Sequence, residues 1–193
     1  MAQVIKTYYD NGQLEEEYFE NDGKKEGEYK LYHNNGQLCI ICNYVDGKRE
    51  GKYKKYWSNG QLREICNYVD GDREGEFKLY HNNGQLYCIC DYVNGKRDRE
   101  YKEYYEDGQL DMICNYVDGK TEGEYKSYYP NGQLYRTCNY VNGKMEGEYK
   151  QYYQNGELWQ IYNYVDGQLS EIYNFVDPDD YVVQNKNWFV YSL

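Results

Sequence analysis

Apolar and polar residues alternate along this chain in short runs that stop at regularly spaced glycines. One run reads Tyr-Lys-Leu-Tyr over residues 29–32, and another reads Leu-Cys-Ile-Ile-Cys-Asn-Tyr-Val over residues 38–45. β-Branched and aromatic residues dominate both runs, and Gly recurs every 11 or 13 residues, which disfavours a helix. The pattern therefore predicts short β-strands, two in each repeating unit.

The breaks between the runs are Asn-Gly or Asp-Gly dipeptides with a period of 24 residues. One series of glycines is Gly12, Gly36, Gly60, Gly84, Gly108, Gly132 and Gly156, and the other is Gly23, Gly47, Gly71, Gly95, Gly119, Gly143 and Gly167. Both residues of such a dipeptide tolerate the positive φ that a type I′ turn requires, so each dipeptide predicts a hairpin turn. Copies without insertion or deletion indicate a repeat array rather than a domain with one central core.

We therefore predict an all-β fold, namely an elongated single-layer antiparallel β-meander of seven 24-residue hairpin repeats with a C-terminal capping segment. The array is expected to span residues 1–177. Pro178 prevents continuation of a β-ladder, so residues 178–193 are expected to cap the last strand. A short docking peptide is the alternative for this tail.

Equivalent positions of the stacked copies form columns, and several columns are aromatic. Lateral packing of such side chains holds a sheet together, but the same rings could also line a binding groove, and the two interpretations are compatible. Leucine (Leu38 and its equivalents) and valine (Val45 and its equivalents) form further columns that we expect to pack. The aromatic residues that we consider as a candidate partner-binding face are Tyr32, Tyr56, Trp57, Tyr80, Tyr104, Tyr105, Tyr128, Tyr129 and Tyr152.

Other columns are charged or variable. Lysine occupies the position of Lys30 in every copy, near an acidic row formed by Glu26 and its equivalents, and we expect the two to pair across strands on a solvated face. Two columns vary freely. They are Glu16, Ile40, Glu64, Cys88, Met112, Arg136 and Gln160, and Thr7, Leu31, Lys55, Leu79, Glu103, Ser127 and Gln151. We expect them to point to solvent or to a partner.

One glycine column has a single exception. Gly27, Gly51, Gly75, Gly123 and Gly147 share a position at which the fourth full copy has Arg99. If this position requires positive φ, Arg99 should strain or bend the array, because an L-residue adopts that conformation at a cost.

The net charge and the apolar runs of the chain limit the classes of partner and the location that we expect. The net charge of −11 repels phosphate backbones and anionic lipids, so we expect neither a nucleic-acid partner nor membrane association, whereas a basic protein would be attracted. The first residues lack the pattern of a signal peptide, and no apolar run approaches the length of a membrane span. We therefore expect a cytoplasmic protein.

The spacing of the cysteines and histidines does not indicate a disulfide, a metal site or a catalytic site. Cys42, Cys66, Cys90, Cys114 and Cys138 occupy one column, at a spacing of about 10 Å that is too long for a disulfide. Cys39 and Cys42 lie three residues apart, so on a strand they face opposite sides and cannot bind one ion. His33 and His81 are two repeats apart. We expect no cofactor, no metal site and no catalysis.

The unit Glu-Gly-Glu-Tyr-Lys-x-Tyr-Tyr-x-Asn-Gly-Gln-Leu followed by Asn-Tyr-Val-Asp-Gly-Lys resembles the MORN (membrane occupation and recognition nexus) repeat over residues 3–177. It is most similar to the variant of bacterial antitoxin-like proteins and giant DNA viruses, and the composition favours a viral source, which would mean the host cytoplasm. The resemblance implies a non-enzymatic scaffold for protein–protein interaction or structural assembly. The alternatives are an antitoxin-like inhibitor of a basic effector and a lipid-surface binding module. A homodimer could form through an end of the array, by pairing of the strand from Val4 to Tyr9.

Overall fold

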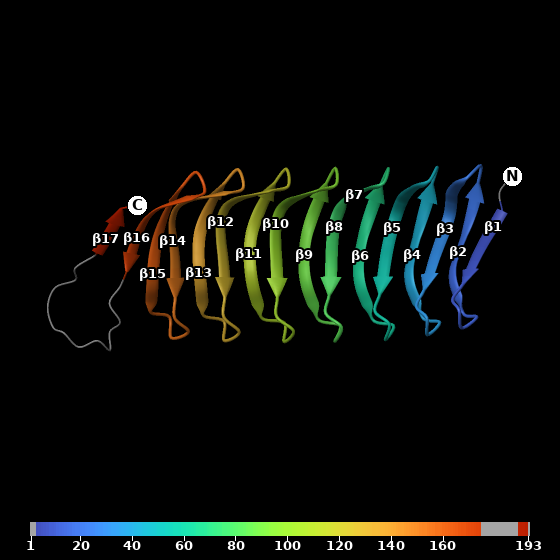
Figure 1. Ribbon diagram of the computed structural model, residues 1–193, viewed down its shortest axis with the longest axis horizontal. Coiled ribbons are helices and arrows are strands. Elements are labelled where there is room, and N and C mark those ends of the chain that lie inside the picture. Colours follow the sequence, from blue (N-terminus) through green and yellow to red (C-terminus); the bar gives the residue numbers. More distant parts are fainter. Residues whose placement is uncertain (1–2, 175–188, 193) are drawn as a thin grey trace. The chain divides into compact units, whose positions relative to one another are not determined.

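The computed structural model describes residues 3–174 and 189–192, and within them every regular element is a β-strand (Figure 1). Contacts divide the chain into two units. Unit 1 comprises residues 1–98 and 106–108, and unit 2 comprises residues 99–105 and 109–193. The boundary falls inside β10, next to Arg99.

Unit 1 contains β1 (Gln3–Tyr8), β2 (Leu14–Asn21), β3 (Lys24–Tyr32), β4 (Leu38–Val45), β5 (Lys48–Tyr56), β6 (Leu62–Val69), β7 (Asp72–Arg73), β8 (Gly75–Tyr80) and β9 (Leu86–Val93). β10 (Lys96–Tyr104) begins in unit 1 and ends in unit 2. Unit 2 continues with β11 (Leu110–Val117), β12 (Lys120–Tyr128), β13 (Leu134–Val141), β14 (Lys144–Tyr152), β15 (Leu158–Val165), β16 (Gln168–Asn174) and β17 (Phe189–Ser192).

Within each unit, strands that follow one another in sequence pair antiparallel, with β7 and β8 both pairing with β6. This order confirms the predicted all-β antiparallel meander of hairpin repeats. Residues 178–188 and 193 of the expected cap lie outside the described residues. Residues 189–192 form β17, which pairs antiparallel with β16. The capping role of the whole segment stays a prediction.

The two series of turns differ, and only one is of the expected type. At Asp46-Gly47 both residues have positive φ, 50° and 83°, which is a type I′ turn. At Asn35-Gly36 only the glycine does, with φ 81°. There the Gly36 N–H donates to the His33 carbonyl, which closes a type I turn that is followed by a left-handed glycine. Asn35 instead uses its Oδ1 to accept the Gln37 N–H at 3.1 Å.

The most buried side chains are cysteines and aromatic residues. Cys42, Cys66, Cys90, Cys114 and Cys138 are only 3–6% exposed, as expected for small apolar groups at the centre of a thin sheet. The expectation that the valine column packs is wrong. Val45 and its equivalents are 37–56% exposed, because they lie beside the type I′ turns at the ends of the strands.

Arg99 adopts the conformation of the glycines it replaces. Its φ is 65°, whereas φ at the glycines of this column lies between 70° and 76°. The position is a β-bulge. Between β4 and β5, for example, the pairing passes from Ile41↔Lys54 to Asn43↔Glu50. The predicted strain at Arg99 is therefore present as a left-handed backbone conformation.

Candidate interaction surfaces

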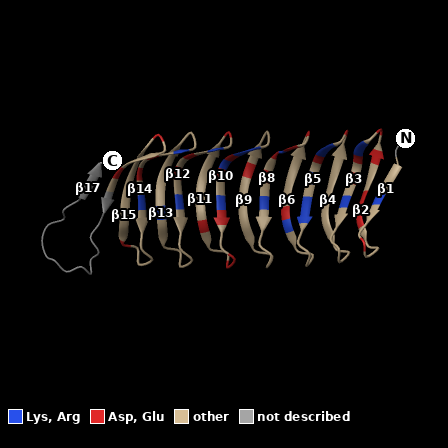
Figure 2. Ribbon diagram, viewed as in Figure 1, with Lys and Arg blue, Asp and Glu red and all other residues tan. Residues whose placement is uncertain are grey.

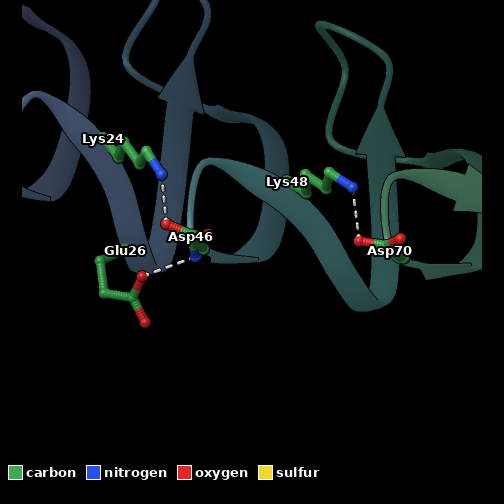
Figure 3. A network of polar contacts seen from close by, with 5 residues as sticks. All are labelled: Lys24, Glu26, Asp46, Lys48 and Asp70. Carbon is green, nitrogen blue, oxygen red and sulfur yellow. Dashed lines mark hydrogen bonds and ion pairs between the residues drawn. The ribbon is translucent and has the colours of Figure 1, made fainter.

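Polar contacts connect the type I′ turns at Asp46, Asp70, Asn94, Asn142 and Asp166 to the preceding repeat, and Figure 3 shows the first two. The Lys24 ammonium lies 2.6 Å from the Asp46 carboxylate, and Glu26 accepts the backbone N–H of Asp46 at 2.8 Å. The next repeat has the same arrangement, with Lys48 bound to Asp70 and Glu50 bound to the Asp70 N–H. The acidic row of Glu26 therefore binds turn backbone, not the lysine column with which we expected it to pair.

The column of Tyr, His and Trp residues that directly follow β1, β3, β5, β10 and β12 connects consecutive repeats by hydrogen bonds. Trp57 Nε1–H donates to the Tyr80 carbonyl at 3.2 Å, and the Tyr105 and Tyr129 hydroxyls donate to the Tyr128 and Tyr152 carbonyls at 2.6 and 2.8 Å. Tyr9 and His33 make the equivalent contacts. Tyr, Trp and His share an aromatic ring with a polar tip, which explains why this column accepts all three residues.

The candidate partner-binding residues thus fall into two groups. Trp57, Tyr105 and Tyr129 lie beside the turns, are half-buried and donate to backbone. The others end a strand two residues after a lysine, so they lie on the lysine-bearing side of the sheet, and all are half-buried. These are Tyr32, Tyr56, Tyr80, Tyr104, Tyr128 and Tyr152. Binding by either group stays a prediction.

On the lysine-bearing side, which we name the Lys/Glu face, most lysines form ion pairs with a glutamate of the same strand. Figure 2 marks the charged residues along the strands. Lys78 pairs with Glu76 at 2.6 Å, Lys126 with Glu124 at 2.8 Å and Lys150 with Glu148 at 2.6 Å. Residues two apart on a strand share a face, so this pairing follows from strand geometry. Such exposed pairs contribute little free energy.

Tyrosine pairs cover the opposite side, which we name the tyrosine face. In each hairpin a ring of the first strand meets a ring of the second strand at 5.6–6.1 Å between centroids, in T-shaped or tilted geometry. The first-strand members, on β3, β5, β8, β10, β12 and β14, are Tyr29, Tyr53, Phe77, Tyr101, Tyr125 and Tyr149. The second-strand members, on β4, β6, β9, β11, β13 and β15, are Tyr44, Tyr68, Tyr92, Tyr116, Tyr140 and Tyr164.

In unit 1, cationic side chains lie over these rings. The Lys25 ammonium is 4.1 Å from the Tyr29 ring centroid, and the Arg49 and Arg73 guanidinium carbons are 5.2 and 4.9 Å from the Tyr53 and Phe77 centroids. Sequence reasoning missed this column, although cations at 25, 49, 73 and 97 were a visible signal. Lys25 and Arg73 are paired with carboxylates, since Lys25 lies 3.6 Å from Glu16 and Arg73 lies 2.8 Å from Glu64.

Unit 2 differs at this column, where Thr121 and Met145 stand in place of the cations. The consequence is exposure of the rings. Tyr53, Tyr68, Phe77 and Tyr92 of unit 1 are 5–8% exposed. By contrast the unit 2 rings of Tyr116, Tyr125, Tyr140, Tyr149 and Tyr164 are half-buried. Two rings depart from this division, since Tyr101 of unit 2 is 3% exposed and Tyr44 of unit 1 is half-buried.

Arg136 supplies a cation to unit 2 from a different column. It occupies the position of Glu64, and its guanidinium carbon lies 5.2 Å from the Tyr125 ring centroid. The two variable columns oppose each other on the tyrosine face, as in Leu31↔Ile40 and Ser127↔Arg136. Their expected exposure is only partly correct, since Ser127 is 4% and Cys88 3% exposed.

No grouping of three or more His, Cys, Asp or Glu side chains that could hold a metal ion occurs in residues 3–174 and 189–192. In the same part of the chain no helix is long and apolar enough to cross a membrane.

Comparisons with known proteins place these repeats in a family. A comparison with curated proteins returned no match. A solved structure described as the crystal structure of TcdB2-TccC3-Cdc42 matches 90% of this chain at 13% identity with a TM-score of 0.21, and this chain spans 13% of that chain's length. That TM-score is too low to bear on fold or function. The family model described as the MORN repeat variant matches residues 4–21, 25–46, 49–70, 73–94, 100–118, 121–142 and 145–166. The chain, whose hairpins these segments follow, therefore belongs to the MORN repeat variant family.

Proposed function

We propose that this chain is a non-enzymatic scaffold of the cytoplasm that binds a protein partner through the tyrosine face of unit 2. The observation that carries this proposal is the exposure of the rings in β11–β15. In unit 1 the equivalent rings are buried beneath Arg49 and Arg73, whereas Thr121 and Met145 leave the unit 2 rings half-exposed.

The chemistry of this surface suits protein recognition. Tyrosine and arginine dominate the residues that contribute most to protein–protein binding, because a tyrosine offers a large rigid ring and a polar tip. The Lys/Glu face is a weaker candidate, since its ion pairs bind one another. A face of half-exposed tyrosines across consecutive strands therefore supports a role in binding.

The experiment is partner capture from native lysate with the full chain and one closing variant. Arg136→Glu combined with Met145→Arg copies the Glu64–Arg73 pair of unit 1 into unit 2, so the fold should tolerate it and the rings should be covered. We expect the closing variant to lose the captured protein, and Lys150→Gln on the Lys/Glu face to retain it. The proposal is wrong if no protein is captured above background, or if the closing variant captures it equally well.

A further inference from the structure

Arg136 differs from Arg73 and Lys25 in having no acidic partner on the tyrosine face. Arg73 is bound by Glu64 and Lys25 by Glu16. The residues paired with Arg136 across the sheet are Ser127 on β12 and Gln151 on β14, and both are neutral. Arg136 is half-buried, and a charge removed from water is stabilised only when hydrogen bonds or an opposite charge replace the solvent.

The hydrogen bonds of Arg136 orient its guanidinium without using all its donors. Nε–H donates to Ser127 Oγ at 3.1 Å and Nη2–H donates to the Tyr125 hydroxyl at 3.0 Å. A guanidinium has five N–H groups. Three of them are therefore left for an acceptor that the described residues do not supply.

A groove of about 440 Å³ adjoins this guanidinium. Five tyrosines, Met145 and Gln151 contribute to its lining, and Arg136 is the only lining residue charged at neutral pH. Burial raises the pKa of Cys138 to about 11 and that of Tyr140 to about 12, so both stay protonated. The groove thus combines one positive charge with phenol hydroxyls and apolar ring surface.

We propose that Arg136 and the tyrosines around it bind a carboxylate, supplied by an Asp or Glu side chain of a protein partner docked on unit 2. This rests on the proposed function and names the group that the tyrosine face recognises. The bound carboxylate takes the place that Glu64 occupies beside Arg73 in unit 1. A planar guanidinium matches a planar carboxylate with two parallel hydrogen bonds.

Charge and shape favour this ligand over other oxyanions. One guanidinium balances one carboxylate, whereas a phosphate dianion would bring a second negative charge to a chain of net charge −11. The groove is open to solvent, while small metabolites are usually enclosed over most of their surface. An open groove on a sheet face admits a side chain that projects from a second protein.

Arg49 also lies opposite a non-acidic residue, since its neighbour in the variable column is Ile40. It donates to the Tyr68 hydroxyl at 3.3 Å. The rings beside it, Tyr53 and Tyr68, are only 5% and 6% exposed. A ligand therefore has better access to Arg136 than to Arg49.

The test is an NMR titration of the full chain, observing arginine Nε–Hε signals with three probes: N-acetyl-glutamate methylamide, its neutral glutamine counterpart and inorganic phosphate. Arg136→Lys identifies the Arg136 signal by its loss. Arg73, already paired with Glu64, is the internal control. We expect the glutamate probe to shift the Arg136 signal saturably at millimolar concentrations, to leave Arg73 unmoved, and to bind at least about tenfold more tightly than the glutamine probe.

Three results would overturn the site: no saturable shift at Arg136, an equal shift at Arg73, or an equal response to the glutamine probe. A stronger response to phosphate than to the glutamate probe would overturn the assignment of a carboxylate. The titration needs no partner. Its failure therefore leaves the scaffold proposal standing, whereas failure of partner capture leaves the Arg136 titration unaffected.

Discussion

Replacing Arg99 by glycine should stabilise unit 2, because Arg99 holds a backbone conformation that glycine adopts freely. Its φ of 65° lies within 5–11° of the values at the glycines of the same column. A left-handed conformation costs an L-residue about 1–2 kcal/mol. Glycine loses more conformational freedom on folding, which offsets about 0.5–1 kcal/mol of that gain. We therefore expect Arg99→Gly to stabilise by about 1 kcal/mol.

The reverse change at an equivalent position is the matched control. Gly123 has a φ of 76°, and a Cβ added there meets no atom within 4 Å. Gly123→Arg should therefore destabilise through its backbone alone, by about 1 kcal/mol. Arg99→Ala removes the guanidinium but keeps the positive φ, so the difference between Arg99→Gly and Arg99→Ala isolates the backbone contribution.

Urea denaturation followed by far-UV circular dichroism measures these differences, and thermal melting supplements it. For a chain of this length 1 kcal/mol corresponds to a shift in Tm of about 2–4 °C. Arg99→Gly should raise the midpoint and Gly123→Arg should lower it. If both variants match the wild type, or if Arg99→Gly is less stable than Arg99→Ala, the argument from backbone strain is refuted.

Three further predictions concern single contacts. Tyr129→Phe removes the hydroxyl that donates to the Tyr152 carbonyl, so it should lower the free energy of unfolding in urea by about 0.5–1.5 kcal/mol. If Tyr128→Phe lowered the free energy of unfolding equally, this role of the Tyr129 hydroxyl would be contradicted. Hydrogen bonding and Coulombic attraction by Lys24 hold the pKa of Asp46 below its ordinary value of 3.8. The unfolded state therefore binds a proton at Asp46 more readily than the folded state, so the stability of the fold should fall below about pH 5. Melting curves should show a smaller fall in Lys24→Met, because this variant lacks the ammonium. Burial raises the pKa of Cys66 to about 11 and that of Cys90 to about 12. Both thiols should therefore resist alkylation at pH 8 until urea unfolds the chain. Rapid labelling of the folded protein would contradict their burial.

The repeat period, the strands and the strain at Arg99 could be predicted because they depend on local backbone conformation. Each Asx-Gly dipeptide limits the chain to a few turns, and a column of glycines with one exception indicates positive φ before any contact is known. The type of the Asn35-Gly36 turn could not be read in this way. Asn35 accepts a hydrogen bond from the Gln37 N–H instead of adopting positive φ, and Asx-Gly permits both outcomes.

Pairing between side chains was harder to predict because it depends on register across the bulges. The bulge between β4 and β5 changes which residues face each other, so the Glu26 column meets turn backbone while the Lys30 column meets the glutamate two positions earlier in its own strand. Strand alternation alone would have identified the pairing of Lys30 with Glu28, because residues two apart on a strand share a face. The position of Arg136 over Tyr125 needed the three-dimensional structure, because the cation belongs to a different column from Arg49 and Arg73.

These contacts also explain which columns can vary. Glu26 and Trp57 bind backbone atoms of the next repeat and Asp46 binds Lys24 of the preceding repeat, so a change at these positions weakens the array itself. Arg73 and Glu64 bind each other, and the array accepts another solution at these two columns. Met145 and Arg136 are that other solution. The exchange removes a carboxylate and leaves a guanidinium beside exposed tyrosines, so the repeats of unit 2 keep the architecture of unit 1 and acquire a surface that unit 1 keeps closed.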